Sequence, residues 1–186
     1  MNDEIANPAP LGLMGFGLTT VLLNLSNAGL LDSSSFGMIF SMGIFYGGMA
    51  QIFAGMWEMK RGNTFGATAF SSFGLFWISL VAIELSPVLG WVDDLPSGPV
   101  MAAYLAMWGI FTALMTLSTF KASRALQVVF ITLTILFFLL AIGKASSIAE
   151  ITTVAGYEGI LCGLSAIYLA TAELLNETYG RQIFPF

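Results

Sequence analysis

Histidine is absent from this sequence of 186 residues, and Cys162 is its only cysteine. Without an imidazole there is no Ser-His or Cys-His nucleophile pair, no histidine ligand for a metal and no axial histidine for haem. A single cysteine forms no intramolecular disulfide. A Gly-x-x-x-x-Gly-Lys-Ser/Thr loop for nucleotide phosphates is also missing. We therefore expect a protein that is not an enzyme and that needs no cofactor and no metal.

Charged residues are scarce too, at 9% of the chain, whereas hydrophobic residues make up 57% and the mean hydropathy is +0.86. The 11 acids and 6 bases give a net charge of −5 and form no basic cluster, so we expect no nucleic acid partner. This much apolar surface exceeds what a small soluble core can bury. The lipid bilayer is therefore the expected environment of most of the chain.

Six apolar stretches follow one another along the sequence, each close to the roughly 20 residues that a helix needs to cross a bilayer. Their predicted positions are about 10–30, 36–57, 65–86, 99–118, 125–143 and 154–175. The connections between them are short, so consecutive helices must be antiparallel neighbours. The sequence therefore predicts an all-α membrane protein, a bundle of six transmembrane helices in a single transmembrane domain over residues 1–186.

The basic residues are distributed unevenly between the predicted loops. Five of them follow the second, fourth and sixth spans, namely Lys60, Arg61, Lys121, Arg124 and Arg181. Only Lys144 falls in a loop on the opposite side. Cytoplasmic loops carry the excess of Lys and Arg, so both termini are expected in the cytoplasm.

Polar residues on the first span are ordered. Phe16, Thr20, Asn24 and Asn27 are spaced by four, four and three residues, which places them on one face of a helix. Polar side chains in a span face the protein interior or a water-filled cavity, because hydrocarbon offers them no partner. This stripe therefore lines a pathway or forms hydrogen bonds between helices, and the spacing alone does not choose.

Other polar groups in the spans are more scattered. A similar but weaker stripe on the fourth span consists of Trp108, Thr112, Thr116 and Thr119. Gln51 stands alone in the second span, where its amide needs a partner or water. Glu58 and Glu173, near span ends, are candidates for a proton relay. The alternative is that they extend to the membrane interface, and it applies equally to Glu84 and Glu158.

The start of the first span reads Asn7-Pro8-Ala9-Pro10-Leu11-Gly12-Leu13. Asn is a favoured N-cap and Pro a favoured first-turn residue, so a helix begins here with free N–H groups and the positive end of its dipole. Such an end can bind a carboxylate, although an ordinary helix start explains the same residues. No Lys or Arg lies inside a span, so an anion in transit would be held weakly, which suits rapid flux.

The string at residues 7–13 is also a family signature, and the chain resembles the acetate uptake transporters, or acetate/succinate transporters, of bacteria, archaea and fungi. The resemblance continues at residues 15–17, 43–48, 50–55, 62–66 and 166–170 and covers nearly the whole chain. It implies a six-helix protomer, a ring-like homo-hexamer, and a separate path for acetate and related short carboxylates within each protomer.

The resemblance also implies a hydrophobic constriction built from one residue on each of three helices. By local motif these residues are Phe16, Phe73 and Leu133. The second position is commonly tyrosine in the family, so the gate here lacks a hydroxyl that could hydrate or select the anion. Ala166 matches a position close to the path that is implied to limit substrate size.

We therefore expect transport of acetate, and of succinate by the same resemblance, across a prokaryotic cytoplasmic membrane, with residues 7–13 forming the cytoplasmic vestibule. Acetate is mostly an anion at neutral pH, so its uptake against an inside-negative potential needs a proton partner or a steep gradient. Channel-like conduction and proton symport both remain open. The alternatives are a channel for a small neutral solute, such as undissociated acid, glycerol or water, and a non-transporting membrane scaffold or sensor.

Overall fold

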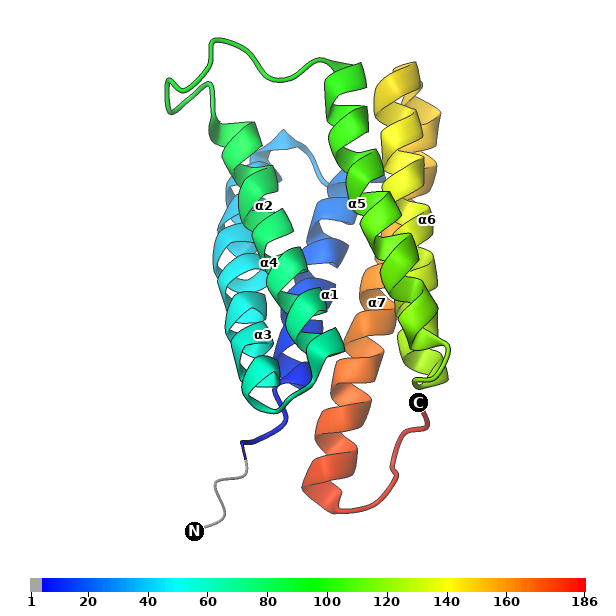
Figure 1. Ribbon diagram of the computed structural model, residues 1–186. Helices are drawn as coiled ribbons and strands as arrows, with labels where there is room; N and C mark the ends of the chain where they lie inside the picture. The colour runs from blue at the N-terminus through cyan, green and yellow to red at the C-terminus, as the bar shows by residue number, and fades with distance from the viewer. Residues whose placement is uncertain (1–4) are drawn as a thin grey trace.

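The computed structural model describes residues 5–186, and within them six helical spans are long and apolar enough to cross a membrane. The elements are α1 (Ala9–Asn27), the 3-10 turn η1 (Ser33–Ser35), α2 (Phe36–Met42), the π-helical η2 (Gly43–Ala50), α3 (Gln51–Lys60), α4 (Thr64–Leu85), α5 (Gly98–Thr119), α6 (Arg124–Ser146) and α7 (Ala149–Tyr179). The spans run side by side, and the start of α1 and the C-terminal segment lie at the same end of the bundle (Figure 1). The predicted six-helix, all-α membrane bundle is confirmed.

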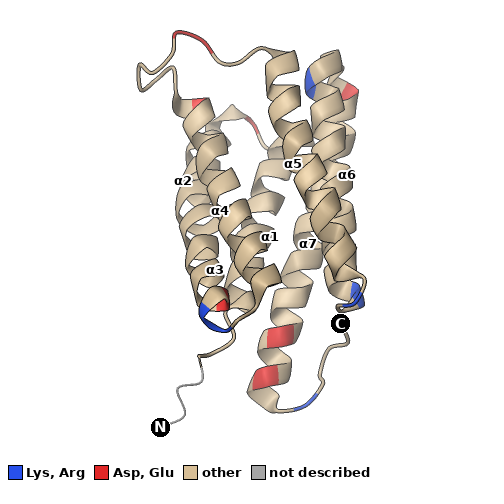
Figure 2. Ribbon diagram, in the orientation of Figure 1, with Lys and Arg blue, Asp and Glu red and all other residues tan. Residues whose placement is uncertain are grey.

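Local sequence signals explain where several helices begin. At α4 the Asn63 carboxamide accepts a hydrogen bond from the Gly66 backbone N–H at 3.1 Å, and at α6 the Ser123 hydroxyl accepts one from the Leu126 N–H at 3.2 Å. These caps satisfy N–H groups that have no partner within the helix. Charged residues gather with the caps and loops at the two ends of the bundle (Figure 2). The apolar middle of each span is thus left to face lipid or its neighbours.

The second span, Ser33–Lys60, changes helix type along its length. Its middle, η2, is a π-helix, which the sequence pattern did not predict. This segment packs closely on α1 and α4: a Cβ at Gly47 would lie 3.0 Å or less from Thr19 side-chain atoms, and one at Gly48 would lie 2.7 Å from Ile78. Glycine at these positions therefore lets the wider helix fit between its two neighbours.

The last span is longer than expected, because α7 has 31 residues and extends beyond 154–175 at both ends. Glu173 is consequently inside a helix that continues to Tyr179. α7 lies against α1 through small residues: a Cβ at Gly163 would be 2.8 Å from the Gly17 carbonyl oxygen, and the reverse distance is also 2.8 Å. This close approach brings the start of α1 and the end of α7 to the same site.

Candidate functional site

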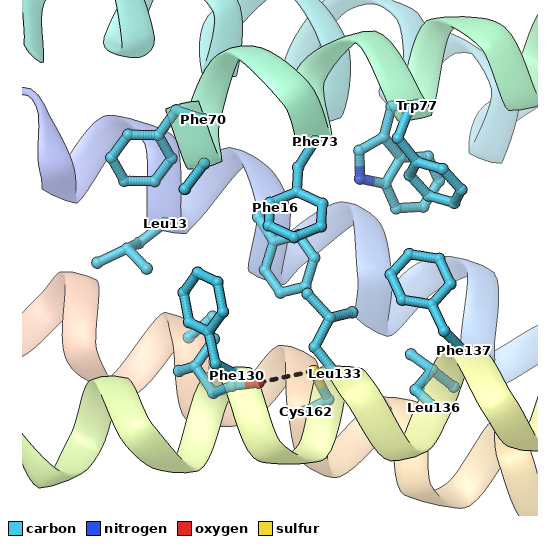
Figure 3. Close-up of a cluster of buried hydrophobic side chains, with 14 of the residues drawn as sticks. Leu13, Phe16, Phe70, Phe73, Trp77, Phe130, Leu133, Leu136, Phe137 and Cys162 are labelled. Carbon is cyan, nitrogen blue, oxygen red and sulfur yellow. Dashed lines mark hydrogen bonds between the residues drawn. The ribbon is translucent and has the colours of Figure 1, made fainter. Parts of the chain in front are cut away.

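Phe16 of α1, Phe73 of α4 and Leu133 of α6 converge in the middle of the bundle, as Figure 3 shows. Their side chains are 6%, 4% and 3% exposed, and the Phe16 and Phe73 ring centroids are 6.1 Å apart. The structure thus brings together the three residues proposed for a constriction. They come from three different helices and form one apolar layer across the bundle.

Three further aromatic rings pack against Phe73. Its ring centroid lies 5.6 Å from Phe111, 6.0 Å from Phe130 and 6.3 Å from Trp108. Tilted and edge-on arrangements of this kind are favourable for aromatic pairs. Phe73 is therefore fixed by α5 and α6 as well as by its own helix.

A cavity of about 130 Å³ lies on the side of this layer nearest the start of α1; we call it the near cavity. Phe16, Phe73 and Leu133 form its deep end. Its walls come from α1, α3, α4, α6 and α7, and they include Ala9, Leu13, Gln51, Glu58, Asn63 and Glu173. Two carboxylates and two carboxamides therefore face a cavity that is otherwise mostly apolar.

Both carboxylates of the near cavity have carboxamide partners. Glu58 is 2% exposed and accepts a hydrogen bond from Asn63 Nδ2 at 2.9 Å. Glu173 accepts one from Asn7 Nδ2 at 3.0 Å. Extension of Glu58 to the membrane interface, the alternative drawn from the sequence, is thus wrong. The two acids predicted as a proton relay lie on one cavity instead.

Residues 7–13 do not all face this cavity. α1 begins at Ala9 with Pro8 in the N-cap position, and the Asn7 carboxamide oxygen accepts bonds from the Ala9 N–H at 3.2 Å and from Arg61 Nη1 at 2.9 Å. Ala9 and Leu13 line the near cavity. The other five do not: Asn7, Pro10 and Leu11 line a separate surface hollow, and Pro8 and Gly12 are buried. Residues 7–13 therefore connect α1 to α7 and to the turn between α3 and α4, and two of them also line the near cavity.

The polar stripe on α1 divides between two roles. Asn24, 1% exposed, donates to the Thr20 carbonyl oxygen at 2.9 Å and packs where a Cβ at Gly159 of α7 would collide with it. Asn27 donates to the Asn24 carboxamide oxygen at 3.0 Å and lines a second cavity. The Thr20 hydroxyl is buried and has no hydrogen-bond partner within residues 5–186. Helix packing explains Asn24 but leaves Thr20 unexplained.

Three further predicted residues differ in their surroundings. The Gln51 side chain donates to the Gly47 carbonyl oxygen at 2.6 Å and lines the near cavity. The Thr112 hydroxyl donates to the Trp108 carbonyl oxygen at 2.7 Å, and neither Thr112 nor Ala166 lines either cavity. Thr116 of the same stripe bonds Thr134 of α6 at 3.2 Å. The α5 stripe therefore belongs to the contact between α5 and α6.

The second cavity, about 180 Å³, lies on the other side of the apolar layer, and we call it the far cavity. Its polar lining residues are Asn27 of α1, Trp77 and Glu84 of α4, and Lys144 of α6. Trp77 is 2% exposed, and its indole N–H has no hydrogen-bond partner within the described residues. Sequence reasoning missed Trp77 and Glu84 as site residues. Their spacing from Phe73 along α4 was the available signal, since Trp77 is one turn from Phe73.

Comparisons with known proteins show the family and the fold. The chain is 56% identical over 184 residues to the succinate-acetate/proton symporter SatP of Escherichia coli K12, covering 99% of this chain and 96% of that protein. It is 34% identical to acetate permease A of Emericella nidulans, over 98% of this chain and 66% of the permease. The solved structure of the bacterial acetate channel SatP superposes with a TM-score of 0.95 at 56% identity, covering 98% of this chain and 99% of that one. Residues 1–184 match the GPR1/FUN34/yaaH family, and the chain belongs to it.

Proposed function

We propose that this protein transports acetate and related short carboxylates, succinate included, across the cytoplasmic membrane of a prokaryotic cell, and that it is not an enzyme. The observation that carries the proposal is the pair of cavities on opposite sides of the layer of Phe16, Phe73 and Leu133. The cavities share no lining residue, so the apolar layer separates them. A solute that crosses the bundle by this route must pass the layer.

An apolar layer of this kind acts as a gate because a narrow hydrophobic passage dewets when it is empty. A two-carbon acid presents a methyl group to the Phe16 and Phe73 rings and to Leu133, and an unbranched acid meets less steric hindrance there than a branched acid such as lactate. Phe73 contributes no hydroxyl. Selection at the layer therefore rests on size and on apolar contact.

We infer that two polar groups on the far-cavity side of the layer bind the carboxylate as it enters or leaves the passage. Thr20 follows Phe16 by one turn of α1, and Trp77 follows Phe73 by one turn of α4, so each shares a helix face with a residue of the layer. The Thr20 hydroxyl and the Trp77 N–H are buried without partners in residues 5–186. Such groups are normally hydrogen-bonded in proteins, which favours a role in binding the solute.

Glu58 and Glu173 support proton coupling as part of the proposal. Moving one anion against an inside-negative potential costs about 2.3 kcal/mol per 100 mV, and a proton moved with the anion removes that cost. Both acids line the near cavity, through which the solute passes. SatP is named a proton symporter in one comparison and an acetate channel in the other, so acetate flux measured with and without a pH gradient at clamped potential distinguishes the two modes.

The proposed assembly is a homo-hexamer in the lipid bilayer, with one path in each protomer. Large apolar side chains are exposed along the outward faces of the helices, among them Met107, Leu114 and Leu117 on α5 and Tyr157, Leu161 and Leu164 on α7. Lipid or neighbouring protomers are the partners that such faces require.

Flux of labelled acetate into proteoliposomes tests the function. We expect flux above that of empty liposomes at pH 5 or pH 7, and its absence at both would refute the carboxylate proposal. Flux that is unaffected by the imposed voltage and carried equally by glycerol would favour the channel for a neutral solute.

For the gate, Phe16→Ala and Leu133→Ala should admit lactate. Leu136→Ala is the matched control, because Leu136 is as buried as Leu133 but lines neither cavity.

A further inference from the structure

Within residues 5–186, Lys144 is the only base at the end of the bundle that lies farthest from the termini. Acids dominate this end, and Figure 2 shows them in the loops and helix ends there; they are Asp32, Glu84, Asp93, Asp94 and Glu150. Hydrogen bonds from the Ser34 hydroxyl and backbone N–H lower the pKa of Asp32, so this carboxyl is ionised at neutral pH. An anion that approaches this end therefore meets mostly negative charge, with Lys144 as the exception.

Among the described residues, Lys144 and Glu84 are the two charged residues that line the far cavity. Lys144 comes from the last turn of α6, and the half-buried Glu84 comes from the last turns of α4. Asn27 of α1 lines the same cavity with one carboxamide N–H bonded to Asn24, which leaves its second N–H. The remaining lining is apolar apart from Trp77. The two charges of the cavity thus cancel.

We propose that the mouth of the far cavity is a carboxylate-binding site, in which Lys144 attracts the carboxylate and Glu84 limits how tightly it is held. The inference rests on the proposed function, because it places the site on the same path. An ammonium group is a compact point charge, and a cavity with apolar walls strengthens its field compared with open water. Asn27 is placed to add a hydrogen bond.

The opposing carboxylate has a physical purpose in a conducting path. A site with Lys144 alone would hold the anion strongly and slow its release, whereas conduction requires binding that is weak enough to leave. With Glu84 present the cavity has no net charge, so attraction is local to Lys144. The affinity of the mouth for the carboxylate should therefore depend on the net charge of Lys144 and Glu84.

A set of charge variants tests this inference through the half-saturating acetate concentration in proteoliposomes at low ionic strength. Lys144→Gln should raise that concentration about threefold or more, and Glu84→Gln should lower it, because the cavity charge becomes negative in the first variant and positive in the second. The double variant should return close to the wild type. Added salt should shrink all three differences, since it screens exposed charges.

Lys121→Gln is the matched control, because Lys121 is an exposed lysine of the opposite end and lines neither cavity. Lys144→Arg keeps the charge and should keep the wild-type value. If the wild type carries flux and both Lys144→Gln and Glu84→Gln keep its half-saturating acetate concentration, the site is refuted and the proposed function stands. The same conclusion follows if both variants shift that concentration in the same direction. Absence of wild-type flux would instead overturn the proposed function. If Lys144→Gln does not fold, Glu84→Gln and its salt dependence still decide the matter.

Discussion

At the scale of the residue, Thr19 and Thr20 are adjacent on α1 and almost equally buried, but their hydroxyls differ. Thr19 donates to the Gly15 carbonyl oxygen at 2.7 Å, whereas Thr20 has no partner within residues 5–186. A buried hydroxyl without a partner is costly, so its retention needs a reason outside stability. We propose that binding of the passing carboxylate is that reason.

Replacement of Thr20 by valine should therefore reduce acetate flux without reducing stability. The isosteric methyl removes a donor for the solute and breaks no hydrogen bond in the protein. Thr19→Val is the control, and it should lower the unfolding free energy by about 1 kcal/mol with less effect on flux. Flux in proteoliposomes and thermal unfolding in detergent give the two readouts. If Thr20→Val is less stable than the wild type but keeps normal acetate flux, Thr20 serves helix packing and does not bind the solute.

Glu158 of α7 is a third group of this kind, since both its carboxylate oxygens are buried and lack hydrogen bonds within the described chain. A carboxyl placed among apolar helices and left unpaired is destabilising. Replacement of Glu158 by leucine should therefore raise the unfolding free energy, by about 1 to 3 kcal/mol, and raise Tm. Glu150→Gln, at the exposed start of α7, should change Tm little. A lower Tm for Glu158→Leu would contradict this account of the unpaired carboxyl.

The sequence could predict part of this residue-level picture. Helical spacing placed Thr20, Asn24 and Asn27 on one face of α1, which the structure bears out in the chain of bonds from Asn27 to Asn24 to Thr20. The spacing of residues shows which face of a helix they share, but it does not show which helix or cavity that face contacts. It therefore could not tell that Asn24 packs on Gly159 of α7 while Asn27 reaches the far cavity.

At the scale of the element, the contact between α1 and α7 depends on glycine. The Gly17 and Gly163 backbones approach so closely that a Cβ on either would lie 2.8 Å from the carbonyl oxygen of the other. Backbone cannot move aside as a flexible side chain can. This contact also positions Asn7 beside Glu173, so it supports the near cavity as well as the bundle.

Gly163→Ala should accordingly destabilise the protein by about 1 to 3 kcal/mol and lower flux, because α7 must move away from α1. Gly37→Ala in α2 is the control, since no atom lies within 4 Å of the added Cβ, and alanine favours the helix. Its Tm should equal or slightly exceed that of the wild type. Thermal unfolding of both variants in detergent is the measurement, and equal values for the two would contradict this account of the contact.

The existence of the six spans was predictable from apolar length, but two features of the elements were not. Hydropathy could not locate the ends of α7, because its terminal turns at Ala149 and Tyr179 are polar and extend beyond the apolar stretch. Nor could it reveal the π-helix at Gly43–Ala50. That feature depends on how closely this segment packs on Thr19 and Ile78, which are distant in sequence.

At the scale of the whole molecule, the two ends of the bundle differ in charge. The end with the start of α1 carries the five bases that follow the second, fourth and sixth spans, whereas the other end carries Lys144 and an excess of acids. Cytoplasmic ends of membrane proteins carry the excess of Lys and Arg. We therefore predict that the near cavity opens to the cytoplasm and the far cavity, with Lys144 and Glu84, to the outside.

Single added cysteines test this orientation without changing any charge. Leu95 lies in the exposed loop between α4 and α5, and Ala122 lies in the exposed turn between α5 and α6, at opposite ends of the bundle. A membrane-impermeant maleimide should label Leu95→Cys in right-side-out vesicles and Ala122→Cys in inside-out vesicles. The native Cys162 is completely buried, so the wild type is the unlabelled control. The reverse pattern would place both termini outside, in which case the Lys144 site would serve anions leaving the cytoplasm instead of those arriving from outside.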